Sequence, residues 1–291
     1  MSARERAERR LAWWLCAPAV AAMLAVTAFP ILYAFWLSLF RYDLRFPGER
    51  HFVGLANYAS VLGSEVWWQA LANTLIITVG SVAVELVLGF ALAALMHRAV
   101  FGRRTVRTAI LVPYAIITVV AALAWRFAFD PTTGFVNALA GLERAWLTER
   151  GAAFFVIIFA EIWKTTPFMA LFLLAGLTLV PQDLLNAARM DGASAAQRFW
   201  RITLPLMKPA VMVALLFRTL DAFRVFDTVF VLTRGALDTE TVSIVGYNAL
   251  ITRLNLGLGS AVSVLIFACV LVIALLYIKG FGIALGKQRR S

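Results

Sequence analysis

The sequence has few charged residues, few cysteines and few histidines. Of its 291 residues, 15% are charged, whereas a soluble domain has about 25%. Its two cysteines, Cys16 and Cys269, stand in long apolar runs without a second cysteine or a histidine at metal-ligand spacing. We therefore expect neither a disulfide framework nor a metal site. No cluster of histidine, cysteine and carboxylate residues supports a membrane-embedded enzyme, so no catalytic residue is predicted.

Apolar residues are in excess. They make up 62% of the chain, against about 45–50% in soluble domains. A membrane-spanning helix needs about 20 mainly apolar residues. Six such runs occur, at approximately 11–40, 70–96, 106–129, 152–179, 206–232 and 258–285. The sequence therefore predicts an all-α integral membrane protein, a bundle of six transmembrane helices.

The first apolar run is longer than the core of a cleaved signal peptide, which has about 7–15 apolar residues. We therefore expect the run to be retained as the first span, either tilted or as a shorter span with a helical extension. Pro18 and Pro30 are predicted to kink it.

Basic residues predict the orientation of the chain in the membrane. If the N-terminus is cytoplasmic, 15 basic residues fall in cytoplasmic segments and eight in outer loops. Such an excess marks the cytoplasmic side. Both termini are therefore predicted in the cytoplasm of a bacterial inner-membrane protein, and topology accounts for the net charge of +11 without a nucleic-acid partner. Residues 1–10 form a cytoplasmic segment, 11–285 the membrane domain and 286–291 a cytoplasmic tail.

The cytoplasmic segment 181–209 has a pattern of its own, PQDLLNAARMDGASAAQRFWRITLPLMKP. We predict a helix capped by Asp183 and extending to Arg189, a turn at Gly192, and a second helix from Ser194 to about Ile202. A surface hairpin lying in the membrane interface is the plainest interpretation of this pattern.

Short motifs in this segment resemble a known family. Ala187-Ala188, Asp191-Gly192-Ala193 and Ile202-Thr203-Leu204-Pro205 resemble the cytoplasmic "EAA" loop of permease subunits in binding-protein-dependent, ATP-driven (ABC) importers. Two further stretches, LANTL at 71–75 and FRTLDAFRVFDTVFVLTRG at 217–235, resemble the sugar permeases of the maltose and glycerol-phosphate type. The resemblance covers most of the chain.

The resemblance implies a type I ABC importer permease fold and half of a translocation pathway for a sugar, with a disaccharide such as trehalose or maltose favoured. It also implies that segment 181–209 couples the chain to a separate ATPase. The implied coupling residues are Asn186, Ala187, Ala188, Arg189, Asp191, Gly192 and Ala193. The family's usual glutamate is Asn186 here, which can hydrogen-bond but cannot pair with a cation as a carboxylate does.

The implied partners are a second, homologous permease, a dimer of ATP-binding subunits, an extracytoplasmic sugar-binding protein or lipoprotein, and membrane lipid. No cofactor is expected in this chain, since ATP and magnesium would be held by the ATPase subunits. The nearest approach to a phosphate-binding loop, GFGIALGKQ near the C-terminus, lacks the required glycine spacing and has glutamine after the lysine.

Charged residues within apolar runs are candidates for function, because burying them in a bilayer is costly. Arg218, Asp221, Arg224 and Asp227 recur at steps of three, so they can neutralise one another along one helix. They either line a sugar pathway or form a structural ion ladder. The predicted substrate-pathway residues are Asn73, Glu161, Arg218, Asp221, Arg224 and Asp227.

Other intramembrane charges leave alternatives open. Glu161 and Lys164 are expected to pair, whereas Glu85 has no evident partner in sequence and is expected to be a hydrogen-bonded carboxyl group inside the bundle, open to protonation. An ion-coupled secondary transporter using Glu85, Asp221 and Asp227 is the alternative function. That alternative leaves the pattern of segment 181–209 unexplained.

Overall fold

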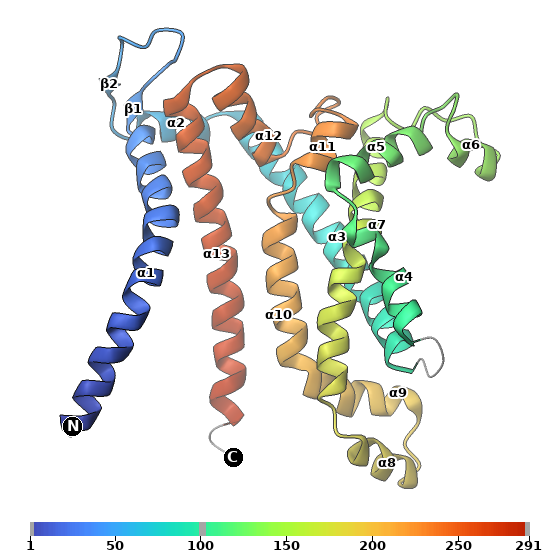
Figure 1. The fold of residues 1–291 in the computed structure, drawn as a ribbon. Coiled ribbons are helices and arrows are strands. Elements are labelled where there is room, and N and C mark those ends of the chain that lie inside the picture. The colour runs from blue at the N-terminus through green and yellow to red at the C-terminus, as the bar shows by residue number, and fades with distance from the viewer. Residues whose placement is uncertain (1–2, 99–102, 289–291) are drawn as a thin grey trace. The chain divides into compact units, whose positions relative to one another are not determined.

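The computed structural model describes residues 3–98 and 103–288, and these are mostly helical (Figure 1). Within these residues, five helices are long and apolar enough to cross a membrane, and a sixth span is reached if two helices joined at a bend are taken together. The predicted all-α membrane fold is confirmed. The described residues divide into two compact units, one made of residues up to Glu65 with Val245–Ala268, the other of Val66–Ile244 with the residues from Cys269 onward.

The first unit contains the first span and the segments that follow it. Its elements are α1 (Ala3–Ser38), β1 (Phe40–Arg41), β2 (His51–Phe52), α2 (Ala56–Leu62), η2 (Asn248–Thr252) and the start of α13 (Leu256–Gln288). Pro18 and Pro30 both lie inside α1. The side-chain amide of Asn57 donates to the carbonyl oxygens of Ser38 (2.7 Å) and Phe40 (2.9 Å) and so fixes the chain where it leaves α1.

The second unit contains the second to fifth predicted spans and the end of the sixth. Its elements are α3 (Glu65–Arg98), α4 (Arg103–Ala115), α5 (Thr118–Ala128), α6 (Phe135–Ala140), α7 (Arg150–Thr178), α8 (Gln182–Met190), α9 (Ala195–Arg198), η1 (Phe199–Thr203), α10 (Leu204–Ala222), α11 (Asp227–Leu232), the first half of α12 (Val242–Tyr247), whose second half belongs to the first unit, and the end of α13. Helix α7 is central and packs against α4, α5, α10 and α11.

Close packing holds α3, α7 and α10 together. Met169 and Leu173 of α7 are fully buried in an apolar cluster with Met96 of α3 and Met207 of α10. A side chain at Gly89 would begin 2.7 Å from Met169, so α3 can pass this close to α7 because residue 89 has no Cβ. The result is a rigid three-helix core on which the remaining elements are placed.

The predicted third span, 106–129, is not one straight helix. It is divided into α4 and α5, which are bent by 87° relative to each other. Pro113 cannot donate a backbone hydrogen bond, and the residues that follow it include the β-branched run from Ile116 to Val120. Ile117 takes an extended conformation (φ −58°, ψ 134°), and the chain changes direction there.

The predicted fifth span, 206–232, is also interrupted. Helix α10 ends at Ala222 and α11 begins at Asp227. No proline or glycine stands between them. The break is supported from elsewhere in the chain, since the Thr241 hydroxyl donates to the carbonyl oxygen of Val225 (3.2 Å), a group that a continuous helix would have satisfied itself.

Candidate functional site

A buried arginine lies at the centre of the second unit. Arg218 of α10 is 1% exposed and Glu85 of α3 is fully buried. Nε of Arg218 donates to Oε2 of Glu85 (2.6 Å), and Nη2 donates to Oε1 of the same carboxylate (3.0 Å). This paired geometry is the strong form of an arginine–carboxylate interaction. Glu85 is therefore a hydrogen-bonded carboxyl group inside the bundle, as expected, and Arg218 is the partner that the sequence did not indicate.

Two more carboxylates share the same guanidinium. Nη2 of Arg218 donates to Oε2 of Glu161 on α7 (3.0 Å), and Nη1 donates to Oδ2 of Asp221 (2.8 Å). Four of the five N–H groups of Arg218 are thus used. One cation and three carboxylates have a formal charge of −2 if all are ionised, so the cluster attracts further hydrogen-bond donors and cations.

Threonine hydroxyls complete this network. Thr165 donates to Oε1 of Glu85 (2.8 Å), and Thr228 of α11 donates to Oε1 of Glu161 (2.5 Å). We call Arg218, Glu85, Glu161, Asp221, Thr165 and Thr228 the ion cluster. It joins α3, α7, α10 and α11.

The ion cluster corrects two predicted pairings. Both oxygens of Glu161 contact partners other than Lys164, whose ammonium nitrogen lies 5.5 Å from the centroid of the Tyr114 ring. The predicted ladder along one helix does not form beyond its first step. Arg218 pairs with Asp221, but Arg224 and Asp227 lie past the end of α10.

A polar cavity of about 410 Å³ opens beside the ion cluster. Both helix breaks contribute to its wall, Tyr114 and Thr118 at the break between α4 and α5, and residues 224–227 at the break between α10 and α11. Helix breaks at membrane depth are found where the backbone lines a cavity. The charged residues lining it are Glu161, Lys164, Asp221, Arg224 and Asp227.

The cavity therefore presents acceptors and donors together. Carboxylates accept, while the lysine, the arginine and the hydroxyl groups of Tyr114 and Thr118 donate. The hydroxyl hydrogens of Thr165 and Thr228 are already donated to Glu85 and Glu161, so these two groups can only accept. The Asp221 side chain is 73% exposed although one of its oxygens is bound by Arg218. Such a site can hold a neutral ligand with many hydroxyl groups.

Four predicted pathway residues line this cavity, and two do not. Glu161, Asp221, Arg224 and Asp227 are in its wall; Arg218 lies behind it in the ion cluster. Asn73 is fully buried elsewhere, where its amide donates to the carbonyl oxygens of Asp238 and Glu240 (2.8 Å each) and its oxygen accepts from Arg150 (3.1 Å). Asn73 thus holds the loop before α12 against α3.

Sequence reasoning missed the hydroxyl groups of the cavity. Tyr114, Thr118 and Thr165 stand in apolar runs and look like ordinary span residues. Only the two breaks bring them to the charged residues, and neither break was predicted. The threonine and tyrosine content of the third and fourth runs was the available signal.

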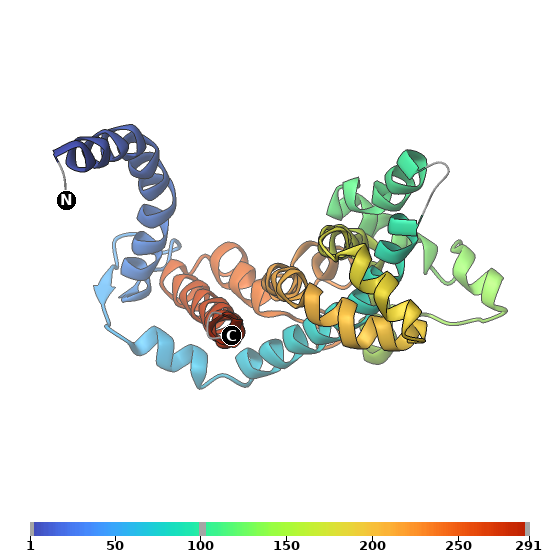
Figure 2. The same ribbon diagram turned by 90° about the horizontal axis from the view of Figure 1, so that it is seen from below.

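Segment 181–209 forms a helical hairpin beyond the ends of α7 and α10, which we call the coupling loop (Figure 1; Figure 2 views it from below). Helix α8 ends at Met190, and Gly192, two residues later, has φ +80°. The backbone N–H of Gly192 donates to the carbonyl oxygen of Arg189 (3.0 Å), and that of Ala193 donates to the carbonyl oxygen of Ala188 (2.9 Å). This pair of bonds is a Schellman motif, which requires a left-handed residue where Gly192 stands. The predicted turn is confirmed.

The two ends of the hairpin differ from expectation in detail. Pro181 precedes α8 without a side-chain cap, so the predicted cap at Asp183 is wrong, and Asp183 lies in the first turn, where its charge suits the helix dipole. Ser194 caps α9 and exchanges hydrogen bonds with Gln197 in a capping box. From Arg198 the chain continues through η1 into α10 without a loop.

The coupling loop is anchored on one side and open on the other. Phe199 packs edge-on against Phe90 of α3 (5.7 Å between ring centroids), and Arg198 donates to the carbonyl oxygen of Ala193. A cavity of about 290 Å³ lies between the loop and the ends of α3 and α7. Of the predicted coupling residues, Ala188 and Ala193 are half-buried and the other five, Asn186, Ala187, Arg189, Asp191 and Gly192, are exposed.

Large apolar side chains on the loop were not singled out by sequence reasoning. Met190 is 89% exposed, Trp200 is 65% exposed and Leu184 is 49% exposed. These side chains are available for contact with another protein or with the membrane surface. Among the described residues, no group of three or more histidine, cysteine or carboxylate side chains could hold a metal ion.

Comparisons with known proteins agree with this arrangement. The family described as "Binding-protein-dependent transport system inner membrane component" matches residues 85–283. The chain is 56% identical over 278 residues to the trehalose transport system permease protein SugA of Mycobacterium tuberculosis, covering 96% of this chain and 91% of that protein. It is 39% identical over 293 residues to the trehalose/maltose transport system permease protein MalF of Thermococcus litoralis, covering 98% and 96%.

A solved structure supports the fold. A chain of a bacterial alginate ABC transporter, in complex with an alginate pentasaccharide-bound periplasmic protein, matches with a TM-score of 0.80 at 22% identity over 94% of both chains. At that identity the similarity concerns the fold alone.

Proposed function

Because the chain belongs to the family of inner-membrane components of binding-protein-dependent transport systems, we propose that it forms half of the pathway by which a disaccharide enters the cell. Trehalose is the favoured sugar, since the relatives at 56% and 39% identity are named for trehalose and for trehalose/maltose. Transport is by alternating access, without covalent chemistry in this chain.

The polar cavity carries this proposal. A disaccharide is neutral and has many hydroxyl groups, so a site for it needs both donors and acceptors. The cavity supplies both from Asp221, Arg224, Asp227 and Lys164, and its volume of about 410 Å³ is within the usual range of small-molecule sites, about 300–1,000 Å³. Arg218 acts from behind the wall by holding Asp221 in place.

Energy comes from separate subunits in this proposal. A dimer of ATPase subunits binds ATP and magnesium and docks on the coupling loop through Met190, Trp200 and the exposed residues 186–192. Asn186 contributes a hydrogen bond there in place of the ionic contact of a glutamate. A second, homologous permease supplies the other half of the pathway, and an extracytoplasmic sugar-binding protein delivers the sugar. Both termini of this chain are cytoplasmic, as the distribution of basic residues favours.

Reconstitution with the neighbouring subunits tests the proposal. In proteoliposomes with ATP inside, we expect uptake of labelled trehalose that requires the binding protein and stops when ATP is replaced by a non-hydrolysable analogue. Asp221→Asn should raise the sugar concentration needed for half-maximal uptake. The control is Asn73→Asp, outside the cavity, which loses the donors to the carbonyl oxygens of Asp238 and Glu240. It should lower the stability of the protein without changing that sugar concentration. Uptake driven by an ion gradient without ATP would contradict the proposal.

A further inference from the structure

An apolar groove runs along the second unit on the side of α4, α3 and α7. Its volume is about 430 Å³, and it is lined by Leu88, Ala91, Leu92, Ala109, Ile110, Pro113, Phe159, Ile162, Trp163, Thr166 and Pro167. The hydroxyl group of Thr166, a polar group in this wall, donates to the carbonyl oxygen of Ile162 (2.6 Å). The groove therefore offers a ligand almost nothing but apolar contact.

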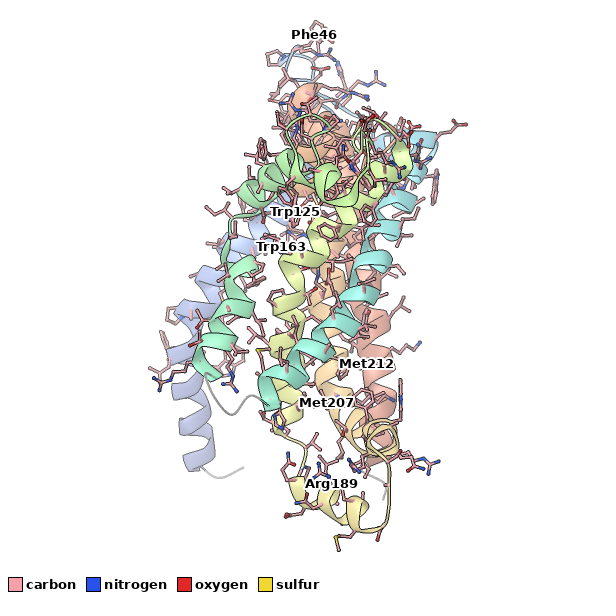
Figure 3. All side chains as sticks on the ribbon, turned by 90° about the vertical axis from the view of Figure 1, so that its right-hand side faces the viewer. Phe46, Trp125, Trp163, Arg189, Met207 and Met212 are labelled. Carbon is pink, nitrogen blue, oxygen red and sulfur yellow. The ribbon has the colours of Figure 1, made fainter. Side chains whose placement is uncertain are left out.

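The groove has a closed end and an end that approaches a row of arginines. Trp125 of α5 packs edge-on against the groove residues Phe159 (4.7 Å) and Trp163 (5.4 Å), so an aromatic cluster lies at the end of the groove where α4 gives way to α5. Trp125 and Trp163 are labelled in Figure 3. At the other end, Arg104 and Arg107 stand in the first turns of α4. Arg107 precedes the groove residue Ile110 by three positions, which places the two on one face of the helix.

Arg107 is half-buried and has an unsatisfied hydrogen-bond donor among the described residues. Its Nε atom is buried and makes no hydrogen bond to them. A buried guanidinium N–H without an acceptor is costly, so an added acceptor is favoured at this position. A phosphate group matches the guanidinium fork and carries the opposite charge.

The groove is long enough to hold much of one lipid tail within one leaflet. Pro113 lies six residues, about 9 Å, beyond Arg107 along α4. On α7, the lining residues Phe159 and Pro167 are eight residues, about 12 Å, apart. Half of a hydrocarbon core of about 30 Å is about 15 Å, so a tail that enters beside Arg107 can lie along the groove without crossing the middle of the bilayer.

We propose that the groove between α3, α4 and α7 binds one acyl chain of an anionic phospholipid whose phosphate is held by Arg107. Arg104, which is exposed, contributes to the attraction of the headgroup to the surface. The ligand is a lipid of the leaflet in which α4 begins. A helix of a partner subunit could fill an apolar groove equally well, but an apolar helix would bring no anionic group to Arg107.

Photocrosslinking of the chain, purified with its accompanying subunits in nanodiscs, tests this site. The probe is phosphatidylglycerol with a diazirine in one acyl chain, in a phosphatidylcholine background. We expect crosslinked peptides from the groove segments of α3, α4 and α7. Arg107→Gln should lower this labelling at least about tenfold, the effect of losing one charge-assisted contact, whereas the exposed neighbour substitution Arg104→Gln should lower it twofold or less.

Two further arms keep the test decisive if Arg107→Gln folds poorly. Ala109→Trp changes an exposed residue of the groove wall and should also abolish labelling. Phosphatidylcholine carrying the same diazirine tail should label the groove weakly. Equal labelling by both lipids, labelling unchanged by Ala109→Trp, or no labelling of the groove by either lipid, as expected if a second subunit covers it, would each overturn the proposal.

Discussion

Replacing Arg218 removes the cation that joins three carboxylates inside the helix bundle. Arg218→Gln leaves Glu85, which is fully buried, and Glu161, whose side chain is 9% exposed, without their guanidinium partner. Removing one partner of a buried ion pair costs about 3–5 kcal/mol. The whole stability of a domain is about 5–15 kcal/mol. We therefore expect the unfolding temperature of the purified protein in detergent to fall by about 6–20 °C.

Two variants of the same cluster act as controls for this prediction. Asp221→Asn removes a carboxylate that is 73% exposed, and an exposed ion pair is worth about 0–1 kcal/mol. Glu85→Gln leaves Arg218 paired with Glu161 and Asp221, so its effect should lie between the other two. Thermal unfolding of the three variants, followed by tryptophan fluorescence, gives the order of their unfolding temperatures. Equal unfolding temperatures for Arg218→Gln and Asp221→Asn would refute a structural role for the ion cluster.

Three further predictions concern the coupling loop, the cavity and an outer loop. A proline at position 192 cannot adopt φ +80° or donate to the carbonyl oxygen of Arg189. Gly192→Pro should therefore abolish sugar-stimulated ATP hydrolysis while the chain still inserts into the membrane. Ala195→Pro, at the first position of α9, should keep the stimulation. Asp221→Asn should raise the sugar concentration that gives half-maximal stimulation of ATP hydrolysis at least about tenfold. Hydrogen bonds from Arg45 lower the pKa of Asp43 to about 2. Carboxyl NMR should therefore find the contact between Asp43 and Arg45 intact above pH 4 and lost as the pH falls through about 2. Arg45→Ala should raise the midpoint of the Asp43 titration toward 3.9.

Contrary results in these assays would be informative. Unchanged stimulation in Gly192→Pro would remove the hairpin turn from the coupling mechanism. A change in detergent stability alone for Asp221→Asn would leave that carboxylate a structural role. A midpoint for Asp43 near 3.9 would mean that the contact with Arg45 does not persist in solution.

Features determined by neighbouring residues were predictable from the sequence. The apolar runs predicted α1, α3, α7 and α13, because the length of a spanning helix depends only on bilayer thickness. The turn at Gly192 was predictable too, since a left-handed position at the end of a helix favours glycine. The family was also identified correctly from the loop and span motifs.

Features determined by distant residues were not predictable. Glu85 and Arg218 are 133 positions apart, so the sequence marks each as a costly buried charge without naming its partner. The break at Phe223–Phe226 has no proline or glycine and depends on Thr241, 16 positions from Val225. The predicted ladder assumed an unbroken helix, and it failed with that assumption.

The course of α10 connects the two candidate sites. The coupling loop passes through η1 directly into α10, a helix of 19 residues, which is about 28 Å long. Its far end carries Arg218 and Asp221, so the same rigid element holds the ion cluster and one wall of the cavity. A displacement of the loop therefore moves Asp221 together with the guanidinium that also binds Glu85 and Glu161. Because those two carboxylates belong to α3 and α7, either these helices move with α10 as one body or the ion cluster must open when the cavity changes shape.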